Sequence, residues 1–202
     1  MMRSRRIFLA ASAVAAASSA IPLRGSADVS GFDLAAFQAR AREPFRHRQA
    51  FASPLVADGA VLGFMLNSLD AYETGFGAGA GTLHAAAVLY RTGVALALDD
   101  DAWRTFGIAD VIRRAGDRVT TTADGGNPFV NGPEARRIAD LQSRLASFFV
   151  CRNALNDMAR RCSTSLDVLQ AHFLPGMMMV PAGVAAINAL QEEHFTLFVA
   201  SA

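Results

Sequence analysis

Residues 147–155, Ser-Phe-Phe-Val-Cys-Arg-Asn-Ala-Leu, decide the fold that the sequence predicts. The stretch opens with a short apolar run of two Phe and a Val, which is typical of a buried strand. The run stops at Cys151, and apolar residues then recur at helical spacing from Ala154 to Ala159. Open α/β sheets usually bind their ligands where a strand ends and a helix begins, so Cys151 occupies an informative position.

Cys151 has two interpretations. The amino end of a helix carries a partial positive charge, and Arg152 and Arg160 would add to it, which favours the reactive thiolate form. The alternative is a small, inert core residue, because free cysteines are often buried for packing alone. The sequence leaves both interpretations open.

The second cysteine, Cys162, continues the apolar face of the helix expected after Cys151, so we expect it to pack in the core. If one helix joins the two cysteines, the helical rise places their α-carbons roughly 16 Å apart. A disulfide needs α-carbons within about 7 Å. We therefore expect no intramolecular bridge.

Other apolar runs predict further strands, and segments with helical periodicity lie between them. The run at Leu83–Tyr90 is almost continuous, which is typical of a strand covered on both faces. Strands are also expected at Phe148–Cys151, Met177–Val180 and Phe195–Val199. Alternating strands and helices predict an α/β three-layer sandwich with a mostly parallel sheet of four or five strands.

The amino terminus has the features of an export signal. Ser4–Leu9 reads Ser-Arg-Arg-Ile-Phe-Leu and leads into an Ala-rich apolar stretch, and Gly25–Ala27 offers a cleavage site. A short apolar stretch after a basic start is typical of a signal peptide and not of a membrane-spanning helix. The paired arginines resemble a twin-arginine signal, with an ordinary secretory signal as the alternative. We expect residues 1–27 to be removed and the product to be a soluble periplasmic protein without stable membrane insertion.

The charge balance argues against nucleic acid as a partner. All nineteen basic residues are Arg, and four of them precede Asp28, where the chain has no acidic residue. The remaining fifteen Arg face eighteen Asp and Glu, so the exported part has a net charge of −3. A slightly acidic protein of this kind lacks the basic surface that nucleic acids or anionic membranes attract.

Residues 28–57 are expected to form a helical arm. Asp33 is a plausible cap for an amphipathic helix that runs to Arg42, and Pro44 then ends or kinks it. The basic run at 40–48 is typical of a solvated helix face, with an anion-binding face as the alternative. We expect this arm to pack on the domain of residues 58–202 or on a neighbouring subunit.

Several motifs do not point to a cofactor or a metal. The glycines of Gly75–Gly81 follow a helix and precede a strand, the reverse of the order in dinucleotide-binding loops. Asp99–Asp101 are better explained as helix caps than as cation ligands. The other candidate ligands are isolated in the sequence or alternate between the faces of a strand: His84, His172, His194 and Met177–Met179. We therefore expect no metal and no cofactor.

The order of these parts resembles the DsrE/DsrF-like family, over roughly Val61 to the carboxyl terminus. The pieces that carry the resemblance are Leu83–Tyr90 followed by Ala95–Asp99 and Trp103, then Val150–Leu155, then Val180–Val184 with Leu190–Gln191. The resemblance implies a flavodoxin-like fold for residues 58–202 and a homo-oligomer, a trimer or a hexamer. Some members carry sulfur as a persulfide on a Cys after a central strand, and Cys151 matches that position.

Two functions follow as hypotheses. The first is an exported sulfur carrier or transferase in which Cys151 accepts a persulfide sulfur from a donor protein or small molecule. The second is a non-catalytic periplasmic oligomer that binds a small ligand or a protein partner in the same crevice. The candidate crevice residues around Cys151 are Arg152, Asn153, Asn67 and Arg91. The first function requires an accessible thiol, whereas the second allows a buried and inert one.

Overall fold

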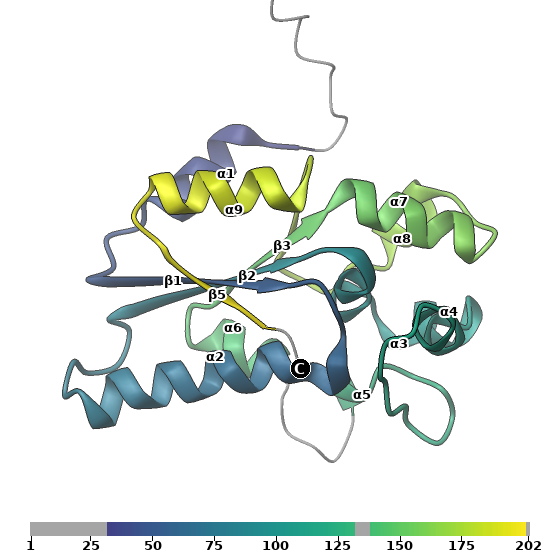
Figure 1. Ribbon diagram of the computed structural model, residues 1–202, viewed down its shortest axis with the longest axis horizontal. Helices are drawn as coiled ribbons and strands as arrows, with labels where there is room; N and C mark the ends of the chain where they lie inside the picture. Colours follow the sequence, from purple (N-terminus) through teal and green to yellow (C-terminus); the bar gives the residue numbers. More distant parts are fainter. Residues whose placement is uncertain (1–31, 132–137, 201–202) are drawn as a thin grey trace, which may run out of the picture.

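The fold is built on a parallel sheet of five strands in the order β4-β3-β2-β1-β5 (Figure 1). The structure is a computed structural model that describes residues 32–131 and 138–200, so the expected export signal lies outside the described residues. The strands are β1 (His47–Ser53), β2 (Leu83–Leu89), β3 (Ser147–Cys151), β4 (Met177–Val180) and β5 (Thr196–Val199). All four neighbouring pairs are parallel. The predicted α/β sandwich is therefore confirmed, with five strands.

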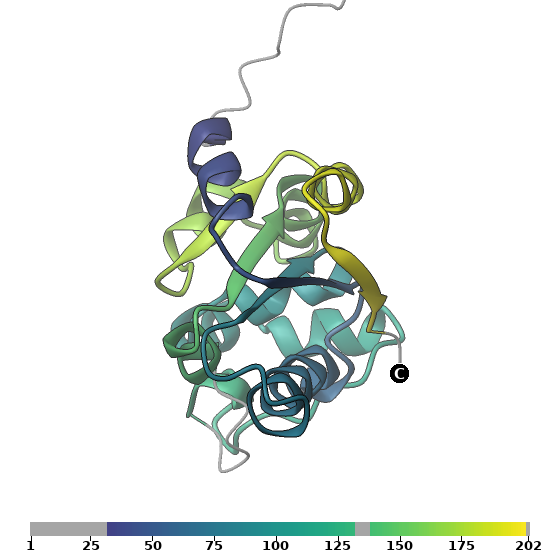
Figure 2. The same cartoon turned by 90° about the vertical axis from the view of Figure 1, so that its left-hand side faces the viewer.

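Helices cover both faces of this sheet. The helices are α1 (Leu34–Ala41), α2 (Ala60–Asp70), α3 (Asp100–Thr105), α4 (Ile108–Arg114), α5 (Pro128–Asn131), α6 (Ile138–Ser143), α7 (Arg152–Arg161), α8 (Leu166–Ala171) and α9 (Gly183–Glu192). Figure 2 shows α1 and α9 on one face of the twisted sheet and α2 on the other. This arrangement is the three-layer sandwich of a flavodoxin-like fold. None of the helices in the two described ranges combines the length and hydrophobicity that crossing a membrane requires.

Strand β3 shows why the sheet needs cover on both sides. Its five residues are all buried, and successive side chains point to opposite faces. Phe148 and Val150 belong to the larger apolar cluster, whereas Phe149 belongs to the smaller cluster beneath α1 and α9. The central strand β2 is likewise buried at every position. The short, continuous apolar runs in the sequence therefore correspond to strands sandwiched between two helical layers.

The expectation of a helical arm over residues 28–57 needs a correction. Helix α1 is present, and Asp33 caps it by accepting a hydrogen bond from the Ala36 amide at 2.9 Å. His47–Ser53, however, is strand β1, which lies inside the sheet between β2 and β5. Its second half is buried and pairs with both neighbours, so this segment contributes to the core of the fold.

Candidate functional site

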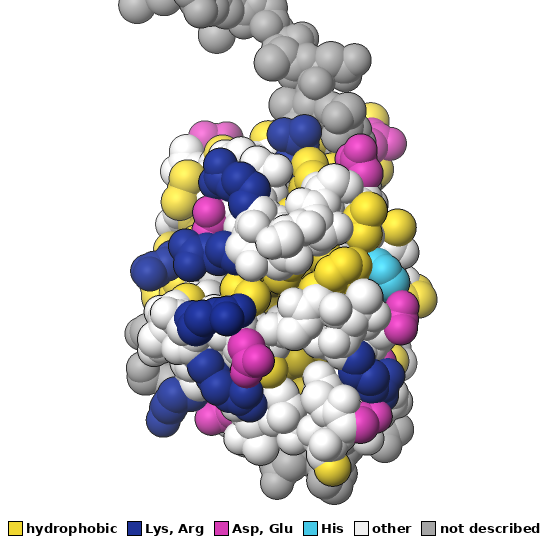
Figure 3. Space-filling model, turned by 90° about the vertical axis from the view of Figure 1, so that its right-hand side faces the viewer, with side chains coloured by type: hydrophobic (Ala, Val, Ile, Leu, Met, Phe, Trp, Pro, Cys, Tyr) yellow, Lys and Arg dark blue, Asp and Glu magenta, His cyan; other side chains and the backbone are white. Residues whose placement is uncertain are grey.

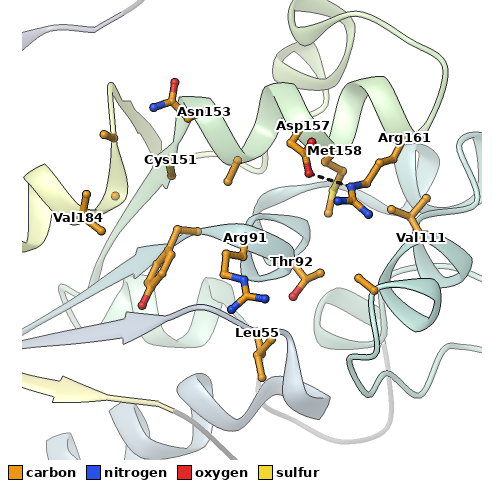
Figure 4. A pocket seen from close by; sticks show the side chains of 15 residues that line it. Leu55, Arg91, Thr92, Val111, Cys151, Asn153, Asp157, Met158, Arg161 and Val184 are labelled. Carbon is orange, nitrogen blue, oxygen red and sulfur yellow. Dashed lines mark hydrogen bonds and ion pairs between the residues drawn. The ribbon is translucent and has the colours of Figure 1, made fainter.

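A cavity of about 520 Å³ lies at the edge where the strands end. Its wall comes from the segments that follow β1, β2, β3 and β4, together with α4 and α7. Parallel α/β sheets characteristically bind ligands at this edge, because loops from several strands converge there. The cavity also holds the cysteine that the sequence placed at the end of β3, and Figure 4 shows the side chains that line it.

Cys151 lies on the wall of this cavity, at the junction of β3 and α7. It is the last residue of the strand and the N-cap of the helix, and its side chain makes no capping hydrogen bond. The residue is 6% exposed. It is thus a buried thiol beside a cavity, at the partially positive end of a ten-residue helix.

The start of α9 packs directly against Cys151. A β-carbon added at Gly183 would lie 3.3 Å from the Cys151 β-carbon and 2.9 Å from the Tyr90 β-carbon, which is too close for an ordinary contact. Glycine at this position therefore lets the first turn of α9 approach the ends of β2 and β3. As a result, the amino ends of α7 and α9 meet at the same part of the cavity wall.

Arg91 follows β2 in a strained conformation. Its φ is +50°, in the left-handed region that costs an L-residue about 1–2 kcal/mol. The chain is held there because Gly93 packs on the end of β1, where a β-carbon would come within 2.3 Å of the Ser53 carbonyl oxygen. The Arg91 side chain is exposed on the cavity rim. It makes no ion pair or hydrogen bond with the residues that the structure describes.

Asp157 and Arg161 occupy the opposite wall, on α7 (Figure 4). Asp157 accepts hydrogen bonds from Arg161 Nε at 2.8 Å and from an Arg160 terminal nitrogen at 3.0 Å. The hydrogen bond from Arg161 is the main reason that the pKa of Asp157 lies below its usual value. Asp157 is therefore ionised at neutral pH, with its charge matched by two arginines on its own helix.

A buried carboxylate fixes the loops below the cavity. Asp117 accepts the Thr92 hydroxyl hydrogen at 2.6 Å and the amide hydrogens of Val56 and Ala57 at 2.7 and 3.1 Å. These bonds join the segment after β1 to the segment after β2. Thr92 and its neighbour Arg91 thereby have a defined position on the cavity wall, and we assign Asp117 a positioning role.

The structure brings together three of the five candidate residues. Cys151, Asn153 and Arg91 line the cavity. Arg152 begins α7 without lining the cavity, and its Nε is buried with no hydrogen-bond partner among the described residues. Asn67 is on the exposed side of α2 and lines a separate hollow of about 280 Å³ with Tyr72 and Phe198, so the expectation that it belongs to the crevice is corrected.

The two cysteines are both free. Cys162 caps the carboxyl end of α7, at the opposite end of the helix from Cys151, and packs against the larger apolar cluster. Burial raises the pKa of the Cys162 thiol, and Arg114 opposes the shift. Cys162 is therefore only partly buried, at the margin of the core in which the sequence predicted it to pack. In the ranges 32–131 and 138–200, no three His, Cys, Asp or Glu side chains converge as a metal site.

A polar cluster at the opposite edge of the sheet is not apparent from the sequence. His84 Nε2 lies 2.7 Å from Ser147 Oγ, and Arg40 Nε donates to the same oxygen at 2.7 Å. The ring of His84 is fully buried, stacked on Phe45. Burial first, and then the charges of Arg40 and Arg48, lower the His84 pKa from 6.5 to about 4. His84 is consequently neutral at physiological pH.

Comparisons with known proteins do not assign a function to this chain. No protein-family model matches the chain, and no curated protein matches it. Among solved structures, the chain is similar to MTH1491, a protein of unknown function from Methanobacterium thermoautotrophicum. The two are 18% identical with a TM-score of 0.43, and the match covers 76% of this chain and 98% of the other.

Proposed function

We propose that the cavity at the carboxyl edge of the sheet is the functional site, and that this chain is a DsrE-like sulfur carrier with Cys151 as the acceptor. The observation that carries the proposal is the position of Cys151 on the cavity wall, at the start of α7. The amino end of a helix carries a partial positive charge, a setting in which reactive cysteines occur. Arg91 also lies on the wall of this cavity.

The proposed step is a transfer of sulfane sulfur without net oxidation or reduction. The Cys151 thiolate attacks the outer sulfur of a donor persulfide, R–S–SH. A bond forms between the two sulfurs, and the S–S bond of the donor breaks. The electron pair leaves with the donor as R–S⁻, which takes up the proton of the transferred sulfur or one from solvent. Cys151 then carries a persulfide, which the reverse exchange passes to an acceptor.

The low exposure of Cys151 supports a second candidate function. A thiolate must be reached by its donor, and only 6% of this residue is exposed. In the second function the cavity binds a small ligand or a protein partner without covalent chemistry, and Cys151 contributes only to the wall. Both functions use the cavity, but only the sulfur carrier forms a persulfide on Cys151.

Intact mass spectrometry after treatment with inorganic polysulfide separates the two functions. We expect the folded wild-type chain and Cys162→Ser to gain the mass of sulfur atoms, and Cys151→Ser to remain unchanged. The Cys162→Ser variant is the matched control, because it leaves Cys151 as the single thiol. If Cys162→Ser gains no sulfur while it remains folded, Cys151 is not an acceptor and the binding function takes its place.

The proposal includes export and self-association. The paired Arg5-Arg6 followed by an apolar stretch supports a twin-arginine signal and a periplasmic product. The edge strand β5 exposes Phe198 (38%) and Val199 (51%), an apolar surface that supports a homo-oligomer, a trimer or a hexamer.

A further inference from the structure

The charges on the cavity wall favour an anion. Arg91, Arg161 and Asp157 are its charged lining residues. Asp157 is already bonded to both Arg160 and Arg161 on α7, so it offers no partner to Arg91. Figure 3, which views the molecule from the side at which the strands end, shows basic side chains gathered along one side of this face. A negatively charged group in the cavity would therefore have an arginine on each of two walls.

The helices that begin at the cavity add to this preference. Both α7 and α9 are ten residues long, and neither has a side-chain cap or an acidic residue in its first turn. Other helices of the fold are capped by a side-chain oxygen: α1 by Asp33, α3 by Asp99 and α8 by Ser165. Helix α2 also begins without either feature, but its first residues do not line the cavity. Two uncompensated positive helix ends therefore meet at the cavity, where Gly183 brings α9 against Cys151.

The backbone around Arg91 has a defined conformation that places its side chain on the cavity. Arg91 is in the left-handed region, with its guanidinium unpaired among the described residues and its side chain on the cavity. The packing of Gly93 on Ser53 and the bond from Thr92 to Asp117 hold this conformation.

The cavity is larger than a bare ion requires. Its volume of about 520 Å³ lies within the range of small-molecule sites, roughly 300–1,000 Å³. Apolar side chains form much of the remaining wall, among them Leu55, Val111, Met158 and Val184. An inorganic ion would leave this apolar surface without a partner.

We propose that the cavity binds a small organic molecule that carries a terminal oxyanion, a phosphate or a sulfonate, held between Arg91 and Arg161. The inference rests on the proposed function in taking this cavity as the functional site, and it requires no reaction at Cys151. In the sulfur-carrier function, the bound molecule is the small-molecule donor or acceptor.

Calorimetric titration of the mature chain in low-salt buffer tests the inference, with phenyl phosphate and inorganic phosphate as probes. Phenyl phosphate is expected to bind the wild type, and Arg91→Gln is expected to weaken binding about tenfold or more, because it removes a charge-assisted hydrogen bond. Arg91→Lys, which keeps the charge, should retain more of the affinity than Arg91→Gln. The matched control is Arg46→Gln, which removes an exposed arginine near the other edge of the sheet and should leave binding unchanged.

Each outcome decides a part of the inference. If inorganic phosphate binds as tightly as phenyl phosphate, the free ion is the ligand. The claim that the ligand is an organic molecule is then wrong. Absence of phosphate binding, or equal binding by the wild type and a folded Arg91→Gln, overturns the inference entirely. If Cys151 nevertheless gains sulfur from polysulfide, the proposed function stands without it. If phosphate binds and Cys151 gains no sulfur, the oxyanion site stands and sulfur transfer is wrong.

Discussion

Gly183 and Cys151 are in such close contact that a single added methyl group at Gly183 would lie 3.3 Å from the Cys151 β-carbon. The same methyl group would lie 2.9 Å from the β-carbon of Tyr90. This contact joins the ends of β2 and β3 to the first turn of α9, and it therefore fixes the shape of the cavity around the thiol.

Gly183→Ala is expected to destabilise the fold and disturb the site together. The new methyl group forces α9 to shift, and overpacking of this kind costs typically about 1–3 kcal/mol of the free energy of unfolding. Urea unfolding measures this loss, and the rate of sulfur loading at Cys151 should change in parallel. Gly75→Ala is the matched control, because its added β-carbon meets nothing within 4 Å. Equal stability of the two variants would contradict the tight contact.

His84 should make the stability of the fold sensitive to acid. Its pKa is about 4 in the folded chain and 6.5 ordinarily, so between these values the unfolded chain binds more protons than the folded chain. The His84 contribution is complete above pH 6.5, decreases as the pH falls, and is lost below about pH 4. The loss is about 3 kcal/mol at most, since one pKa unit corresponds to about 1.4 kcal/mol.

Urea unfolding at a series of pH values checks this, with His84→Gln as the comparison. The other histidines and the carboxylates contribute equally to the free energy of unfolding of the wild type and the variant. Their contributions therefore cancel when the two free energies are subtracted. That difference should diminish as the pH falls from 6.5 to 4. A difference that stays constant over this range would show that His84 does not titrate as the buried cluster with Ser147 and Arg40 requires.

Export should depend on the paired arginines. Replacing Arg5-Arg6 with Lys-Lys is expected to reduce strongly the amount of periplasmic protein, because the S-R-R-x-F-L pattern resembles a twin-arginine signal. Cell fractionation with an antibody to the chain measures this. Unchanged export of the double variant would leave the ordinary secretory signal as the explanation.

Self-association should involve the edge strand β5. Light scattering on the mature chain at micromolar concentration is expected to give a multiple of the monomer mass. Val199→Asp places a charge on the exposed apolar surface and should lower that mass. Val168→Asp, at an exposed position on α8, is the matched control. A monomeric wild-type chain would rule out the oligomer.

Most of the sheet was predictable from the sequence, whereas β1 was not. Strands β2 and β3 are buried throughout and appear in the sequence as continuous apolar runs. In β1 the buried residues begin only at Ala50, and the charged residues before them resembled a solvated helix face. Arg48 is only partly exposed and donates hydrogen bonds to the carbonyl oxygens of Glu43 and Glu193, which periodicity alone does not indicate.

Within the candidate site, the sequence predicts only the residues that stand at or directly after the end of a strand. Cys151 and Arg91 come directly after buried runs, and their position at one edge follows from the parallel sheet. Gly183 and Asp117 act through contacts between segments far apart in the sequence, and no local pattern marks them. Asn67 lies away from the cavity because it is near the carboxyl end of α2, on the exposed side of that helix.

The central claim is that the cavity gives a donor access to Cys151, and alkylation of the Cys162→Ser variant tests it most directly. In this variant Cys151 is the single thiol, so the rate of labelling by iodoacetamide reports on this residue alone. We expect the folded variant to be labelled at a rate within about tenfold of the urea-unfolded chain, because the sulfur-bearing residue lines an open cavity. Labelling that occurs only after unfolding would contradict the account and show that Cys151 is an inert part of the core.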